Sequence, residues 1–229
     1  MFERSGSPVL VATDRDQSAE GRARFIALWR RCLTSDATAA ETAYDRLINL
    51  YGEPHRHYHT LIHIRHCLDE FDPTAARMDD PDAVEMALWF HDAIYQPGAM
   101  DNEWRSAELF RQWSEGLATP AFRQRVHDLV MATTHREPPR DRDAGFTMDI
   151  DLSGFGLPWE QCEQEGRLIR AEFADRTDDE YYPGHLRFLL ALHHRPTFFF
   201  TEWFQRRYES AARANVAHII AGLRARGYR

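Results

Sequence analysis

The segment at residues 83–95, AVEMALWFHDAIY, is apolar on nearly every side. A helix without a polar face is normally buried at the centre of a fold rather than laid on its surface. We therefore predict a central helix here, ended by Pro97 and Gly98. His91 and Asp92 fall inside it, where an ionised carboxylate is costly unless it is paired or bound to a metal. The alternative is that Asp92 lies at an exposed helix end and that His91 only packs.

Apolar residues recur at helical spacing on both sides of this segment. Strand patterns are scarce, and the best candidate, TFFF at residues 197–200, is short. Residues 135–145 contain two adjacent prolines and end in glycine, which predicts a loop. The predicted helical stretches are residues 18–33, 35–52, 58–71, 83–95, 103–117, 120–134, 159–174, 185–194 and 200–223. We therefore predict an all-α fold of about eight or nine helices, with a flexible tail at residues 1–17 and a single domain at residues 18–229.

The amino-acid composition disfavours several classes of protein. A chain of 229 residues with 43% hydrophobic content can bury a substantial core as one domain. A net charge of −8 disfavours binding of nucleic acid polymers, although a bound cation would still allow a small phosphorylated ligand. The three cysteines lack Cys-x-x-Cys spacing, so neither a disulfide framework nor a thiolate zinc site is indicated. With no membrane-span or signal-peptide pattern, we expect a cytoplasmic protein that binds no membrane.

The segment PHRHYHTLIHIRH at residues 54–66 holds five of the twelve histidines of the chain. His59 and His63 are four residues apart, so on a helix they would lie on one face. That spacing suits metal ligands, but it equally suits surface or capping residues. The remaining histidines of the segment are most simply surface or capping residues: His55, His57 and His66.

A carboxylate from elsewhere in the chain would complete a metal site. Asp149 and Asp151 in MDIDLSGFG are the candidates, because apolar neighbours indicate that at least one faces the interior. A helix cap or a turn is the alternative explanation for this pair. Two imidazoles and two carboxylates suit one divalent ion such as Mn, Fe, Co, Ni, Zn or Mg. Four protein ligands on a six-coordinate ion leave positions for water and a substrate oxygen, as metal-assisted hydrolysis requires.

A histidine, a later His-Asp pair and a distant Asp in an all-α chain together resemble the HD-domain superfamily of metal-dependent phosphohydrolases. YHTLIHI also resembles the Tyr-His-Asn-x-x-His signature of cyclic-nucleotide phosphodiesterases, and IDLSG is similar to their final-ligand segment. The resemblance implies an HD-domain-like helical bundle in which His63, His91, Asp92 and Asp151 hold the metal. It makes His59 a candidate proton donor rather than a ligand.

Five segments carry a more specific resemblance: YGEPHRHYHTLIHI, WFHDAIYQPGAMDNEWRSA, LVMATTHR, DIDLSGFG and FQRRYESAARANV. Together, over about residues 20–225, they resemble a bacterial subgroup of predicted HD phosphohydrolases whose substrate is generally unassigned. Thr60 stands where the phosphodiesterase signature has Asn, and the glutamine that would read a purine is not found. Cyclic nucleotides are therefore disfavoured. We expect a hydrolase that uses a metal-activated water to cleave a phosphomonoester or phosphoanhydride of a small molecule, such as a nucleotide.

Four further residues are candidates for the reaction. Glu103 begins a helix shortly after the His-Asp pair and could orient the water or accept its proton, although acidic residues are common in first turns. His135 closes an apolar helix and could line the substrate site, although a histidine at a helix C-terminus is also ordinary. Arg56 and Arg136 flank the expected site and could contact phosphate, the alternative being solvated surface arginines.

Two other functions remain open at this point. Some members of the superfamily hold two irons and act as oxygenases, which requires additional histidines between the His-Asp pair and the final Asp. His127 and His135 lie there, but they are only eight residues apart and could share one helix. The second alternative is a non-catalytic, metal-stabilised scaffold that binds a nucleotide or a partner protein. A closed coordination sphere would favour the scaffold, and open positions beside His59 would favour the hydrolase.

Overall fold

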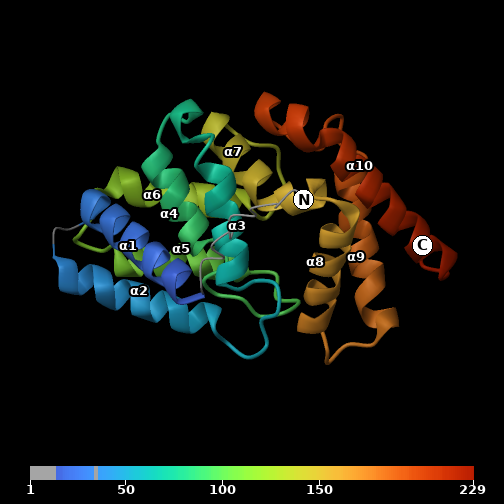
Figure 1. Cartoon of the computed structure of the whole chain (residues 1–229), viewed down its shortest axis with the longest axis horizontal. Helices are drawn as coiled ribbons and strands as arrows, with labels where there is room; N and C mark the ends of the chain where they lie inside the picture. The colour runs from blue at the N-terminus through green and yellow to red at the C-terminus, as the bar shows by residue number, and fades with distance from the viewer. Residues whose placement is uncertain (1–13, 34–35) are drawn as a thin grey trace, which may run out of the picture.

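The computed structural model describes residues 14–33 and 36–229, and within these residues it contains ten α-helices and no strand (Figure 1). The all-α prediction is therefore confirmed. In chain order the elements are α1 (Asp14–Cys32), α2 (Ala37–Tyr51), α3 (Leu61–Phe71), the 3-10 helix η1 (Ala75–Arg77), α4 (Pro81–Phe90), α5 (Asn102–Trp113), α6 (Pro120–Ala132), α7 (Arg142–Asp151), the 3-10 helix η2 (Leu152–Gly156), α8 (Trp159–Glu172), α9 (Asp178–His193) and α10 (Glu202–Ala225).

Helix α4 is the centre of the fold, as its composition predicts. Its residues from Ala83 to Phe90 are all buried, and it contacts α1, α3, α5, α6 and α7. Among the described residues, a continuous apolar core includes residues from every α-helix except α8. In Figure 1, α8, α9 and α10 lie on the opposite side of the molecule from α1 and α2. No helix among the described residues combines the length and apolar character needed to cross a bilayer.

The predicted end of the central helix was wrong. Helix α4 ends at Phe90, so His91 and Asp92 lie in the turn that follows rather than inside the helix. Beyond this point several backbone groups bond to side chains, in addition to the bond from the amide of Ala93 to the carbonyl oxygen of Phe90. Arg56 donates to the carbonyl oxygens of Asp92 at 2.7 Å and Ala93 at 2.9 Å, and Ser106 Oγ accepts the next amide at 2.9 Å.

The predicted loop at residues 135–145 is shorter than expected, because α7 begins at Arg142. The side chain of Asp141 caps this helix by accepting from the amide of Ala144 at 3.0 Å. A side-chain cap of this kind contributes about 1 kcal/mol, which offsets the similar cost of placing Gly145 inside the helix. The cap brings Asp149 and Asp151 onto one regular helix.

Two other predictions of local structure need correction. Helix α1 begins at Asp14, so residues 14–17 are not a tail, and residues 1–13 lie outside the described residues. Residues 197–200 form bends rather than a strand. The backbone amides there bond to a carboxylate and not to a partner strand. Glu209 accepts from the amides of Phe198 and Phe199 at 2.8 to 3.1 Å.

Asp149 ties α7 to the start of α10. Its carboxylate is 1% exposed and accepts from the amide of Phe200 at 2.8 Å, and from the amide and hydroxyl of Thr201 at 2.7 Å each. This carboxylate therefore serves as a cap for the last helix. The alternative that Asp149 is the metal ligand is not supported by this placement.

We expect Asp149→Ala to lower the free energy of unfolding by about 3 kcal/mol, because it leaves two partly buried amides without an acceptor. Urea unfolding followed by circular dichroism measures the change. The exposed Asp128, on α6, provides the matched control, and Asp128→Ala should change stability by less than about 0.5 kcal/mol. A loss below about 1 kcal/mol in Asp149→Ala would contradict the capping role.

Candidate metal centre

Three elements bring four side chains together below the surface. His63 lies in the first turn of α3, which starts there because Thr60 caps it by accepting from the amide of Ile62 at 3.2 Å. His91 and Asp92 follow the end of α4, and Asp151 is the last residue of α7. Because α4 packs against both α3 and α7, the four predicted ligands meet at one place.

The donor atoms of these side chains are spaced as ligands of one ion would be. His91 Nε2 lies 3.1 Å from both His63 Nε2 and Asp92 Oδ2, and Asp92 Oδ2 lies 3.6 Å from His63 Nε2. Asp151 Oδ1 lies 3.3 Å and 3.4 Å from the two imidazole nitrogens. Atoms that share an ion at 2.0–2.2 Å lie roughly 3.0–3.6 Å apart. The geometry therefore fits a single cation between the four groups.

The protonation pattern of His91 also fits a cation. Its Nδ1 donates to the carbonyl oxygen of Leu88 at 2.9 Å, which directs Nε2 at the cluster. Metal-ligating histidines commonly fix their other nitrogen in this way. Burial opposes charge on His91, but Asp92 and Asp151 raise its pKa well above the ordinary value. The surroundings thus stabilise positive charge at this point, and a divalent ion would supply it.

Cys67 adds a donor that the sequence analysis did not include. It lies one helical turn after His63, and its Sγ is 3.6 Å from His63 Nε2. Ligand atoms of His63, Cys67, His91 and Asp151 all lie within 4.8 Å of one another, so this buried group could itself hold a metal ion. Burial raises the pKa of the Cys67 thiol well above its usual value. The four-residue spacing from His63 was the available signal.

His135 contacts the cluster through Asp151. Its Nε2 donates to Asp151 Oδ2 at 2.7 Å, leaving Oδ1 directed at His63 and His91. Among the described residues other than glycine, His135 has the one positive φ, 55°, and Arg195 donates to its carbonyl oxygen at 3.1 Å. Held backbone strain of this kind is typical of functional sites. The structure therefore shows that His135 orients the carboxylate of Asp151, while the predicted contact with substrate stays a prediction.

His59 lies before α3 and not on it, so the predicted shared helix face with His63 was wrong. The two rings are nevertheless close, with centroids 6.0 Å apart. The His59 ring stacks on Tyr95 at 4.1 Å, and its Nδ1 donates to Glu172 Oε2 at 2.6 Å. Because Nδ1 is engaged, Nε2 is the nitrogen that remains available for chemistry.

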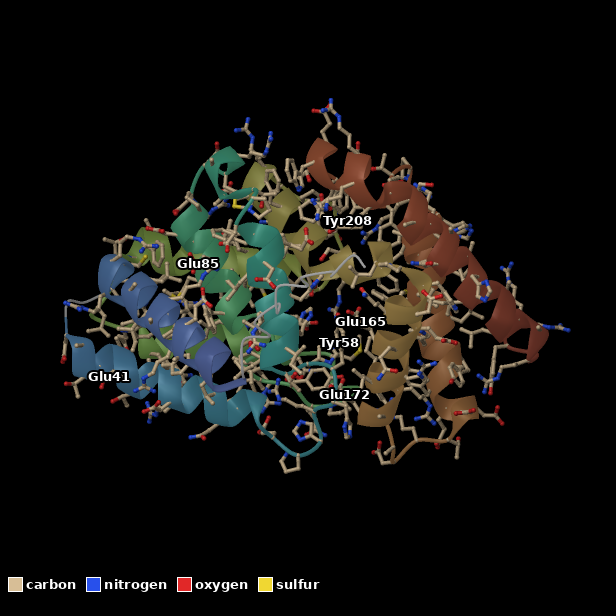
Figure 2. All side chains as sticks on the ribbon, in the orientation of Figure 1. Glu41, Tyr58, Glu85, Glu165, Glu172 and Tyr208 are labelled. Carbon is tan, nitrogen blue, oxygen red and sulfur yellow. The ribbon has the colours of Figure 1, made fainter. Side chains whose placement is uncertain are left out.

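Glu172, the last residue of α8, holds the whole segment around His59. Its Oε1 accepts from the amides of His57, Tyr58 and His59 at 2.8 to 2.9 Å, and Tyr95 donates to Oε2 at 2.8 Å. Burial alone would raise its pKa, but the hydrogen bond and charge of the His59 ring, followed by the amides of His59 and His57, lower the pKa of Glu172 to about 2. Figure 2 shows Glu172 beside Tyr58. No local pattern in the sequence indicated this contact.

The three remaining candidate site residues differ in how far their side chains are exposed to solvent. Glu103 is half-buried in the first turn of α5, where burial, and next the charge of Asp92, raise its pKa. Arg136 is exposed and donates to the carbonyl oxygen of Met100 at 3.1 Å. The side chain of Arg56 is fully buried, and its donors go to Glu53 and to backbone carbonyls. The expected phosphate contact of Arg56 is therefore replaced by a structural role.

Two further histidines lie away from the four ligands. The ion-pair contacts of His127 are with Glu108 and Asp128, at 3.6 Å and 3.5 Å, so its placement gives the diiron alternative no support. His66 is half-buried rather than a surface residue, because its Nε2 donates to Ser153 Oγ at 2.7 Å. Burial lowers the pKa of His66 to about 4, which keeps this contact between α3 and η2 neutral.

We expect the purified protein to take up a single divalent ion, and the double variant His91→Ala with Asp92→Ala to lose this uptake. Removing one imidazole and one carboxylate leaves too few ligands to compete with water. Elemental analysis after dialysis against Mn²⁺ measures the stoichiometry. Undiminished binding in the double variant would reject these two ligands.

Cys67→Ala provides the comparison within the same cluster. The two imidazoles and two carboxylates remain in this variant, and they suit Mn²⁺ without a thiolate. We therefore expect its Mn²⁺ stoichiometry to equal that of the unmodified protein.

Comparison of the chain with protein-family models, with curated proteins and with solved structures gave no significant match. The metal centre is therefore inferred from the placement of its side chains.

Proposed function

We propose that this chain is an HD-type metal-dependent phosphohydrolase that cleaves a phosphomonoester or phosphoanhydride of a small molecule. The observation that carries the proposal is the convergence of His63, His91, Asp92 and Asp151 next to His59. The two imidazole nitrogens lie 3.1–3.6 Å from each other and from an oxygen of each carboxylate. A divalent ion held there would polarise a phosphoryl oxygen and lower the pKa of a water towards about 7.

The exposure of the ligands supports a catalytic site over a closed structural one. The side chains of His63 and His91 are 2% and 1% exposed, whereas those of Asp92 and Asp151 are 14% and 16% exposed. Solvent therefore reaches the cluster from the side of the carboxylates. This opening favours hydrolysis over the scaffold alternative, because a substrate oxygen needs an accessible position.

His59 is suited to donate a proton to the leaving group. Burial disfavours its charged form, but Asp92 and Glu172 raise its pKa above the ordinary value. The stacked ring of Tyr95 and the bond from Nδ1 to Glu172 fix the ring plane. A protonated Nε2 can then be presented to a leaving oxygen at neutral pH.

Glu103 and Arg136 complete the proposed site. The raised pKa of Glu103 makes its carboxylate a better proton acceptor, which suits it to the attacking water. Arg136 is exposed and offers a guanidinium to a substrate phosphate. The three cysteines are free thiols, in keeping with the cytoplasmic location that we expect.

A panel of phosphate esters and nucleotides assayed with Mn²⁺, Co²⁺ or Ni²⁺ tests this function. We expect turnover of at least one substrate, and we expect His59→Ala to lower kcat roughly 100-fold with unchanged metal content, because it removes a general acid. Metal loss in His59→Ala would make it a ligand instead. No turnover across the panel would favour the scaffold.

Glu172→Gln should move the alkaline limb of the pH–rate profile to lower pH. Activity requires protonated His59, so activity is present below the pKa of His59 and is lost as pH rises through it. The negative charge of Glu172 raises that pKa, so removing the charge lowers it. The profile of kcat against pH measures the change, and metal content should not alter. An unmoved alkaline limb would contradict the role of His59 as the acid.

A further inference from the structure

A separate cavity of about 910 Å³ lies at the opposite end of α7 from Asp151. Its walls come from η1, from the first turn of α7 and from the start of α10. A ten-residue helix is about 15 Å long, so this cavity is distinct from the candidate metal centre. Its volume is within the range of about 300–1,000 Å³ found for small-molecule sites.

The cavity is lined by positive charge in a chain whose net charge is −8. Four arginines line it: Arg77, Arg142, Arg206 and Arg207. Of its two carboxylates, Asp141 is occupied by Arg125 at 2.6 and 2.9 Å, and Glu202 pairs with Arg206. Arg77 and Arg207 are exposed, and neither forms a salt bridge among the described residues; the Arg77 guanidinium lies over the ring of Trp203 and that of Arg207 over the ring of Tyr208. Both guanidinium groups are thus held by aromatic rings while their charge is not paired in a salt bridge.

The same cavity offers planar apolar surface. Trp203 lies on its wall with the Arg77 guanidinium 4.7 Å above its ring, and Phe200 lies nearby. Tryptophan faces and guanidinium planes both stack on aromatic rings of ligands.

We propose that this cavity binds a nucleoside phosphate. The phosphates would contact Arg77 and Arg207, because arginine binds phosphate oxygens through paired N–H groups. The base would stack on the side formed by Trp203. This assignment does not depend on the proposed hydrolase, because no ligand of the metal centre lines the cavity.

Calorimetric titration of the full chain with ADP in the presence of EDTA tests the proposal. The chelator removes divalent ions, so turnover at the metal centre does not interfere. We expect saturable binding of ADP, with pyrophosphate and adenosine each binding at least about tenfold more weakly. The double variant Arg77→Gln with Arg207→Gln should weaken ADP binding about tenfold or more. Both arginines are exposed, so the fold should be retained, and circular dichroism checks it.

Arg224→Gln is the matched control, because Arg224 is exposed on the last turn of the same helix α10. It should leave the Kd of ADP within about twofold. Absence of ADP binding at millimolar concentration would overturn the proposal, as would equal weakening in the control. Equal affinity for pyrophosphate would overturn the nucleoside part. Binding that survives in the double arginine variant but is lost in His91→Ala with Asp92→Ala would assign ADP to the metal centre.

Discussion

Two buried imidazoles and two carboxylates lie together between α3, the end of α4 and α7, and this group needs added positive charge to be stable. The nitrogens of His63 and His91 face each other at 3.1 Å, and Asp92 and Asp151 lie beside them. Such a group is costly in an apolar interior unless a cation or shared protons balance it. The packing of α4 against α3 and α7 brings the four side chains together. These three helices also contribute buried residues to the main core.

Around this centre, most of the supporting contacts come from side chains that bind backbone. Arg56 holds the turn after α4, Asp149 holds the entry to α10, and Glu172 holds the segment that carries His59. Each is buried and satisfies polar groups that the helices themselves leave unpaired. Histidines that would otherwise lie on mobile connections are thereby fixed relative to the cluster. The positions of the ligands depend on these anchors as much as on helix packing.

The fold class could be predicted from sequence, because periodicity is a local property. The proposed ligand set rested on a resemblance in short motifs, since spacing alone did not decide between Asp149 and Asp151 or among the histidines. The all-round apolar character of α4 placed it at the centre, and the short polar motifs marked His63, His91 and Asp151. The end of α4 could not be predicted, because it depends on Arg56, which is distant in sequence. Glu172 gave no signal at all, since its partners at residues 57–59 lie 113 to 115 positions earlier and Tyr95 lies 77 positions earlier. Cys67 carries no signal in its spacing from other cysteines, and its only signal is the four-residue spacing from His63.

The contacts of Glu172 have a consequence for how the protein is made. During synthesis, every ligand of the metal cluster has left the ribosome once Asp151 has emerged. The segment at residues 57–59 still lacks its anchor then, because α8 follows later in the chain. In chain order, the four proposed ligands are thus complete before the segment that carries His59 has its anchor. Assembly of the cluster and fixing of the His59 ring are separate events, ordered by translation.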